Sequence, residues 1–209
     1  MLMRRLLCLL TVLTLLTAPA LADDRETVAY WDFDGESLEP TLGQGEIKHD
    51  FADVSFYTGS ELNMPALPEY EARAAEEGDN RALALTSGSG TEGDGTGGNN
   101  GRSIYFLIDT TGRQALEMSF AARRSATGFN RNALAYSTDN GRSFTAIEQP
   151  FTPEDSFAAH TFDLSAIEGV NSRDALILRL TFTGASHSQG NNRLDNVHFT
   201  VGAATPPTD

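Results

Sequence analysis

Most of the chain alternates between apolar and polar residues with a period of two, which is typical of half-buried β-strands. In residues 115–123 the apolar side chains from Leu116 to Ala122 fall on one face, and residues 175–182 alternate in the same way. Similar segments, separated by turns rich in glycine, asparagine and aspartate, lie at residues 28–35, 81–87, 103–109, 133–147, 160–164 and 193–201. This pattern predicts an all-β protein, an antiparallel β-sandwich of jelly-roll type.

Helical signal is confined to two short stretches. Residues 68–78 begin with proline, contain good helix formers and end with glycine, as short helices do. Residues 164–170 are long enough for one turn. We therefore expect one or two short helices that connect strands.

The start of the chain has the three parts of a secretory signal peptide. Arg4 and Arg5 precede an apolar run, and a small-x-small site ends at Ala22. The apolar run is too short to cross a bilayer as a resident helix. We expect cleavage before Asp23 and a secreted protein, extracellular or periplasmic, with no membrane insertion after the signal is removed.

The remaining residues fit one domain. Residues 23–201 have the length of a single sandwich, and residues 202–209 lack an apolar anchor, which predicts a disordered tail. The only cysteine, Cys8, lies in the leader. Stability must therefore come from the core or from a metal and not from disulfides.

The net charge is strongly negative. It is −14 from 15 basic and 29 acidic residues, and it becomes −16 when the two leader arginines are removed. A surface of this sign repels nucleic acid and anionic membranes. We expect no nucleic-acid partner, and an acidic surface that tolerates divalent cations.

Residues 136–144 resemble an Asp-box, a hairpin in which the aspartate braces the turn. Here the aspartate is Asp139, and Asn140 with Gly141 supplies the positive φ angles of the turn. Propellers repeat this motif in every blade, and it occurs once in this chain. The motif therefore predicts a structural turn.

Three carboxylates are expected near the two ends of the domain. Asp32 and Asp34 lie on the first predicted strand, and Asp195 lies on the last. Strict alternation puts Asp195 on the same face as Val197 and Phe199. A buried carboxylate needs a compensating partner.

The partner of Asp195 has several possible identities. Terminal strands of a jelly roll commonly lie side by side, so the three carboxylates are candidates for a structural Ca²⁺ site, because calcium takes six to eight oxygen ligands. The alternatives are an ion pair to Arg193, Arg179 or Arg123, and a carboxylate that caps backbone amides in a turn.

A basic and polar loop at residues 123–132 stands out on this acidic chain. Together with the start of the last strand, it is a candidate for lining a polar groove that binds ligand. The candidate ligand-binding residues are Arg124, Asn130, Arg131, Asn191, Asn192 and Arg193.

Aromatic residues bind sugars by stacking, so each one is a candidate platform. Trp31 alternates with Ala29 and Phe33, which favours the core for this only tryptophan. Tyrosines are better candidates, but the sequence does not select among Tyr30, Tyr57, Tyr70, Tyr105 and Tyr136. His198 is expected as a half-exposed residue of the sheet.

Several segments together resemble a family of bacterial secreted jelly-roll domains. The segments are YWDFDG, MSFAARRSATGFNRNALAYSTDNGRSFTAI, TFDLSAIEGV, LILRLTFTGA and NNRLDNVHFTV. This family is found in surface proteins sorted by a PEP-CTERM signal and beside extracellular enzymes, and it is similar to laminin-G-like and carbohydrate-binding-module sandwiches. The resemblance implies a non-catalytic module, with calcium near the terminal strands at Asp32, Asp34 and Asp195.

The favoured function is binding of an extracellular carbohydrate, with Ca²⁺ as a structural ion. A structural or adhesion protein that contacts a surface component is the alternative, and a small polysaccharide hydrolase or lyase is a third hypothesis. The four histidines lack a metal-binding spacing, and no Gly-x-Ser-x-Gly elbow is present, so no catalytic residue is predicted.

Overall fold

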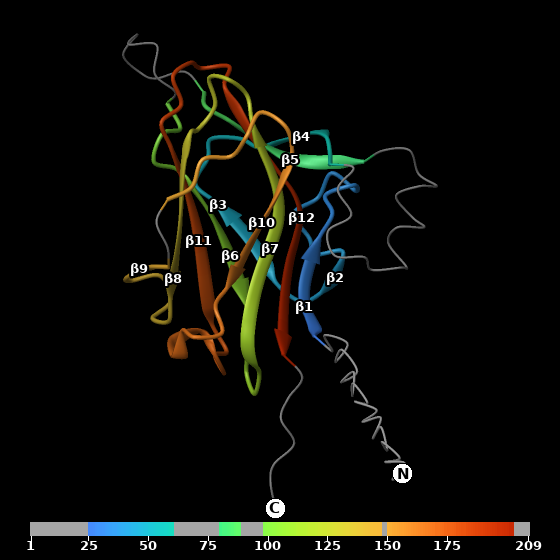
Figure 1. Ribbon diagram of the computed structural model, residues 1–209, viewed down its shortest axis with the longest axis vertical. Helices are drawn as coiled ribbons and strands as arrows, with labels where there is room; N and C mark the ends of the chain where they lie inside the picture. Colours follow the sequence, from blue (N-terminus) through green and yellow to red (C-terminus); the bar gives the residue numbers. More distant parts are fainter. Residues whose placement is uncertain (1–24, 61–79, 89–97, 148–149, 203–209) are drawn as a thin grey trace, which may run out of the picture.

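The fold is described from a computed structural model (Figure 1). The described residues are 25–60, 80–88, 98–147 and 150–202. The predicted signal peptide, the predicted helix at residues 68–78 and the tail after Gly202 lie outside these ranges. Within them, no helix is long and apolar enough to cross a bilayer.

Two antiparallel sheets make up the described structure, and the larger has seven strands. Its strands are β1 (Glu26–Trp31), β2 (Leu42–Gly43), β4 (Ser55–Thr58), β5 (Arg81–Thr86), β7 (Gln114–Arg124), β10 (Ala158–Asp163) and β12 (Asn191–Gly202). The order is β10-β7-β12-β1-β2, while β5 pairs with β12 and β4 pairs with β5. The last strand therefore lies inside the larger sheet.

The smaller sheet has five strands in the order β3-β6-β11-β8-β9. They are β3 (Glu46–His49), β6 (Ser103–Ile108), β8 (Arg131–Ser137), β9 (Thr145–Ala146) and β11 (Leu176–Thr183). A 3-10 helix at Glu168–Val170 falls within the stretch where a single turn was expected.

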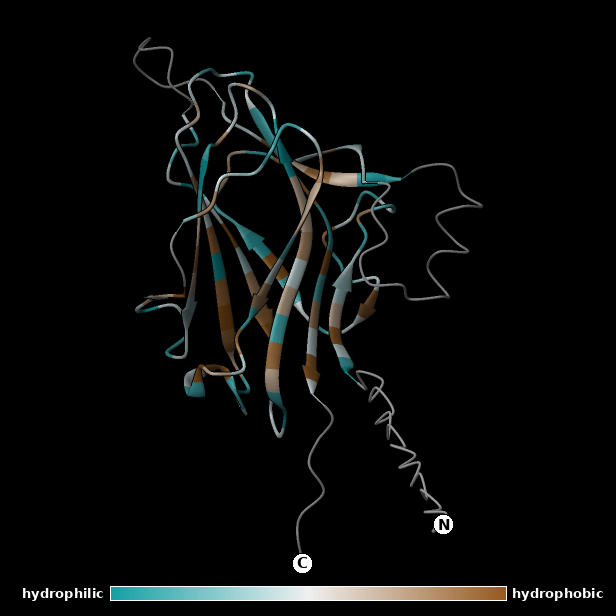
Figure 2. Ribbon diagram, viewed as in Figure 1, coloured by the Kyte–Doolittle hydropathy of each residue, from teal (hydrophilic) through white to brown (hydrophobic). Residues whose placement is uncertain are grey.

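The period-two pattern produces this sandwich because alternate side chains of each strand enter one core. Along β11 buried and partly exposed residues alternate, and its buried residues from Leu176 to Phe182 all join the core. Figure 2 shows apolar and polar colours alternating along β7 in the same way. The antiparallel β-sandwich predicted from the sequence is confirmed.

Trp31 lies in the core, as its alternation predicted. Its side chain is fully buried, and its ring packs edge-on against Phe199 of the same sheet at 6.1 Å and at a tilt against Phe106 of the facing sheet at 5.9 Å. Its Nε1 donates a hydrogen bond to the Leu38 carbonyl at 2.9 Å, so the polar end of the buried ring is satisfied. This ring is not available to stack on a sugar.

The first and last strands are neighbours. β1 pairs antiparallel with β12 from Glu26 opposite Val201 to Trp31 opposite Val197, and Figure 1 shows the two strands side by side. The predicted proximity of the two terminal strands is confirmed.

The face assigned to Asp195 from strict alternation was wrong. Asn196 has a φ of 50°, and the pairing of β12 with β7 shifts register between Asp195 and His198. The extra residue forms a β-bulge, which changes the face on which the following residues lie. Leu194 and Val197 are therefore both core residues, while Asp195 points away from the core.

His198 also differs from expectation, because it is buried and not half-exposed. Its Nε2 lies 2.8 Å from Thr27 Oγ1, and the Tyr30 ring packs edge-on against the imidazole at 5.4 Å. Cross-strand neighbours cover this position, and burial lowers the pKa of His198 to about 4.

The Asp139 turn forms as its sequence predicted. Asn140 and Gly141 have φ angles of 59° and 79°. The Asp139 carboxylate accepts a hydrogen bond from the Ser143 amide at 3.0 Å and another from the Ser137 hydroxyl at 2.7 Å. This turn carries Phe144 onto the outer face of the smaller sheet.

Candidate functional site

The outer face of the five-stranded sheet carries an aromatic and cationic cluster. Lys48, Tyr105 and Arg179 are cross-strand neighbours on β3, β6 and β11, and all three alternate with core residues. The cluster runs from the edge strand β3 to the central strand β11, and the pairing of these strands holds the side chains in register.

The Phe144 ring packs against two members of the cluster, Arg179 and Tyr105. The Arg179 guanidinium carbon lies 3.9 Å from the centroid of the Phe144 ring, a cation–π geometry. The Tyr105 ring lies 6.2 Å from Phe144, and its hydroxyl donates to Asp50 Oδ2 at 3.2 Å. The Asp139 turn, the strands and Asp50 therefore fix two rings and one cation on a single face.

A hollow of about 300 Å³ adjoins this cluster. Leu107 of β6 and Ile177 of β11, a cross-strand pair, contribute to its lining. Glu46, Asn140 and Asp174 add carboxylate and amide groups. An apolar floor with a few polar groups is typical of small-ligand sites.

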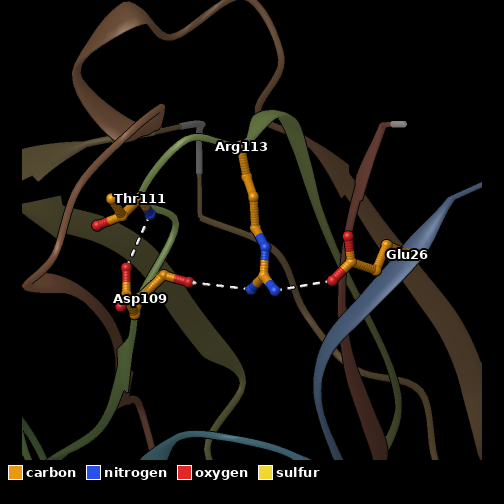
Figure 3. A network of polar contacts seen from close by, with 4 residues as sticks. All are labelled: Glu26, Asp109, Thr111 and Arg113. Atoms are coloured by element: carbon orange, nitrogen blue, oxygen red, sulfur yellow. Dashed lines mark hydrogen bonds and ion pairs between the residues drawn. The ribbon is translucent and has the colours of Figure 1, made fainter. Parts of the chain in front are cut away.

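A second hollow, of about 430 Å³, shares Gln44 and Asp109 with the first. It is lined mainly by polar side chains at the end of the sandwich where β1 begins. Figure 3 shows Arg113 between Glu26 and Asp109. Its Nη2 lies 2.7 Å from Glu26 Oε1, and its Nη1 lies 3.5 Å from the Asp109 carbonyl oxygen. The Thr111 amide donates to Asp109 Oδ1 at 2.7 Å and lowers the pKa of Asp109. This hollow therefore extends the first with charged groups and hydroxyls.

Two of the residues predicted to line a polar groove, Arg124 and Asn192, lie at one end of the sandwich and have structural contacts there. Arg124 donates through Nε to the Pro153 carbonyl at 3.0 Å and through Nη1 to the Ser125 carbonyl at 3.2 Å. Asn192 is buried, and its side-chain Nδ2 donates a hydrogen bond to the Phe129 carbonyl at 3.0 Å. The fold brings these two residues together through the turn that follows β7.

The other members of the predicted groove are more scattered. The Asn191 amide donates to Ser125 Oγ at 2.9 Å, so this residue lies beside the same turn. Asn130 and Arg131 are exposed, and Arg193 lies on the outer face of the seven-stranded sheet. A ligand-binding role for this set of residues stays a prediction.

Asp195 is 1% exposed and is capped by backbone amides. Its carboxylate accepts hydrogen bonds from the Ser60 amide at 2.5 Å and from the Asn196 amide at 2.8 Å. Among the described residues no ion pair joins Asp195 to an arginine. Of the partners considered from the sequence, the capping of amides is the one that the structure contains.

The other two carboxylates lie close enough to affect Asp195. Burial, together with the negative charges of Asp34 and Asp32, raises the pKa of Asp195 to about 8. Asp34 Oδ1 accepts from the Arg81 amide at 2.8 Å, and Asp32 Oδ1 accepts from the Thr41 hydroxyl at 2.7 Å. Three acidic side chains therefore share one region at the junction of the terminal strands.

The chemistry of this region suits calcium, while its present geometry is not that of a metal site. Carboxylate oxygens are the ligands that calcium prefers. Within the part of the chain that the structure describes, no three acidic, histidine or cysteine side chains are grouped to hold a metal ion. The calcium site stays a prediction.

Sequence reasoning did not single out the cluster on the smaller sheet. Tyr105 was one of five tyrosines considered, and Phe144 and Arg179 were not considered as a sugar platform. A signal was available, because Tyr105 and Arg179 interrupt the apolar runs of residues 104–108 and 176–180. The pairing of those strands was the missing information.

Comparison with known proteins identifies the class of fold, a jelly-roll β-sandwich similar to that of carbohydrate-binding modules of known structure. The chain is similar to the CBM22-1 xylan-binding domain of Paenibacillus barcinonensis Xyn10C, with a TM-score of 0.50 and 12% identity over 88% of this chain and 99% of that chain. It is also similar to the tandem CBM22-1-CBM22-2 domain of that protein, with a TM-score of 0.54 and 12% identity over 90% and 48% of the two chains. No family model and no curated protein matches the chain.

Proposed function

We propose that the chain is a secreted, non-catalytic module that binds an extracellular carbohydrate on the outer face of its five-stranded sheet. The observation that carries this proposal is the cluster of Tyr105, Phe144 and Arg179 beside the hollow of about 300 Å³. Ring faces and an apolar floor pack against the C–H groups of a sugar, and the surrounding carboxylates and amides bind its hydroxyls.

The shared fold guides the choice of ligand. The similar domain of known structure is described as xylan-binding, which makes a neutral xylan oligosaccharide the first ligand to test on this chain. The leader at residues 1–22 supports the extracellular location, because its basic start, apolar run and small-residue site have the form of a secretory signal.

The test is a glycan array followed by calorimetric titration of the best neutral oligosaccharide. We expect Tyr105→Ala and Phe144→Ala each to weaken binding by about tenfold or more, because each removes one stacking surface. Tyr57→Ala is the matched control, since this tyrosine lies on the opposite sheet. Equal affinity in the parent and in both ring variants would show that the sugar does not bind on this face.

We also propose that Ca²⁺ stabilises the junction of the terminal strands. The support is the buried Asp195 carboxylate, with Asp34 and Asp32 close enough to raise its pKa. These three side chains would hold the ion, which would supply the positive charge that balances them.

A melting curve tests the calcium proposal. We expect added CaCl₂ to raise the melting temperature and a chelator to reverse the rise, because a ligand bound to the folded state alone stabilises it. The same concentration of MgCl₂ is the control for ionic strength. Identical curves with CaCl₂, MgCl₂ and chelator would exclude a stabilising calcium site.

A further inference from the structure

Two arginines lie side by side on the outer face of the seven-stranded sheet. Arg193 of β12 is directly opposite Arg123 of β7 in the antiparallel register. Each follows the alternation of its strand, because the neighbouring residues Leu194 and Ala122 enter the core. Like charges in directly opposite positions destabilise a sheet, so repulsion between these arginines disfavours the folded state unless an anion lies beside them.

No carboxylate in the described residues compensates the pair. Ion pairs of the described residues, such as those that join Lys48 to Glu46 and Arg113 to Glu26, involve neither Arg123 nor Arg193. The nearest acid along β12, Asp195, accepts hydrogen bonds from backbone amides instead. Burial lowers the pKa of Arg193, and the positive charge of Arg123 lowers it further. Two unneutralised cations are unusual on a chain with 29 acidic and 15 basic residues.

An exposed ring stands beside the pair. Tyr57 is 43% exposed and is the one large exposed hydrophobic residue in the part of the chain that the structure describes. Its ring centroid lies 5.2 Å from the guanidinium carbon of Arg193. Arg193 Nη1 donates to the Thr58 carbonyl at 3.0 Å, which holds the guanidinium next to the ring. The cation and the ring are therefore positioned before any ligand arrives.

We propose that Arg193, Arg123 and Tyr57 form a second binding site, for a sugar that carries a carboxylate or a sulfate ester. The planar guanidinium groups bind the anionic oxygens with charge-assisted hydrogen bonds. The exposed ring of Tyr57 packs against the sugar that bears the anion. The bound anion replaces the missing carboxylate and removes the repulsion between the arginines.

This inference rests on the proposed function for the choice of a carbohydrate, and it assigns an acidic sugar class to a different sheet. We expect each face to bind a different class of ligand through its own side chains. A neutral oligosaccharide depends on Tyr105, whereas an acidic oligosaccharide depends on Arg123 and Arg193. Failure of one site is therefore visible separately from failure of the other.

The experiment titrates the full chain with three oligosaccharides of equal length. They are a neutral xylan oligosaccharide, an oligogalacturonide and a sulfated oligosaccharide, and the two acidic ligands show which anionic group is preferred. We expect Arg193→Gln and Arg123→Gln each to weaken binding of an acidic ligand by about ten- to a hundredfold, the usual effect of losing a charged hydrogen bond. Tyr57→Ala should weaken it by a smaller factor, and raised salt should weaken binding to the parent.

Arg102→Gln is the matched control, because it removes the same charge from an exposed position outside both sites. Arg123→Gln decides the result if Arg193→Gln, which loses the bond to Thr58, melts earlier than the parent. Equal weakening by Arg102→Gln and Arg123→Gln would overturn the proposal, because it would show diffuse attraction alone. Equal affinity for acidic and neutral ligands would overturn it as well. Acidic binding that survives Tyr105→Ala supports it, even if the neutral sugar does not bind.

Discussion

Asp139 and Asp195 both accept hydrogen bonds from backbone amides, and their pKa values move in opposite directions. Asp139 lies in an exposed turn, where hydrogen bonds from Ser143 and Ser137 lower its pKa to about 2. Asp195 accepts amides from Ser60 and Asn196, and burial nevertheless raises its pKa to about 8. The difference between these two aspartates is therefore set by burial, which at Asp195 outweighs the amide donors.

The difference separates two structural roles. The Asp139 turn is a local arrangement, because its donors lie within four residues of the aspartate. The Asp195 junction joins distant segments, since Ser60 and Asp195 are 135 residues apart. We therefore expect substitutions at the junction to affect the whole fold and substitutions in the turn to remain local.

The largest expected effect is that of Asp195→Ala. The substitution leaves the Ser60 and Asn196 amides without their acceptor, and we expect the free energy of unfolding to fall by about 3 to 4 kcal/mol. Chemical denaturation in the presence of a chelator measures this loss. Asp139→Ala is the matched variant, and its loss should be less than a third as large.

Asp195→Asn shows what the junction requires. Asparagine keeps the shape and one acceptor oxygen, so in chelator we expect the free energy of unfolding to fall by only about 1 kcal/mol. With CaCl₂ present the loss should grow, because asparagine is a neutral ligand. Equal losses for Asp195→Ala and Asp139→Ala would contradict the comparison.

His198 gives the next largest effect, through pH. Burial, followed by the charge of Arg25, lowers its pKa from 6.5 to about 4. Between pH 6.5 and 4 the unfolded chain binds a proton that the folded chain does not, so stability falls with falling pH, by about 3 kcal/mol over the window. Denaturation of the parent and of His198→Gln at pH 7 and pH 4 measures the difference. His187→Gln, at an exposed histidine, should retain the acid loss of the parent.

Two glycines sharpen the same comparison. A Cβ at Gly59 would lie 2.7 Å from Asp195 Oδ2 and 2.8 Å from the backbone carbon of Arg81. We expect Gly59→Ala to lower the free energy of unfolding by about 2 kcal/mol through overpacking. At Gly141 a Cβ would meet its nearest atom, Ile177 Cδ1, at an ordinary contact distance of 3.6 Å, but φ is 79°, so Gly141→Ala should cost about 1 kcal/mol. A larger loss at Gly141 than at Gly59 would contradict our view that the junction is the tighter region.

The smallest effect concerns Asp139 alone. Its lowered pKa means that its contribution to stability is present above pH 3.8 and is lost as the pH falls toward 2. An NMR titration of the Asp139 carboxyl carbon should show a midpoint near pH 2. In Ser143→Ala, which removes the hydroxyl donor, the midpoint should rise toward 3.8, and an unchanged midpoint would exclude this hydrogen bond as the cause.

Much of the fold could be predicted from the sequence because its strands alternate regularly. The outward and inward residues of β7 and β11 followed directly from the period-two pattern, and the Asp139 turn followed from its Asn140-Gly141 pair. Adjacent terminal strands are a common feature of the jelly roll. Each of these predictions depends on the local sequence or on a topology that jelly-roll sandwiches share.

The remaining features depend on pairing between strands, which a single sequence does not specify. One bulge at Asn196 moved Asp195 away from the core face, and nothing in the residues around it marks the extra position. The cluster of Tyr105, Phe144 and Arg179 joins two strands and one turn, so it appears only when the strand order is known. The same is true of Arg123 opposite Arg193.

The interior position of β12 has a consequence for the order in which the larger sheet can form. This strand separates β7 from β1 and also pairs with β5, so the sheet lacks its central member until β12 is in place. Pairing of Glu26 with Val201 must close almost the whole chain. The larger sheet is therefore completed by a contact between segments far apart in the sequence, and such contacts are slow to form.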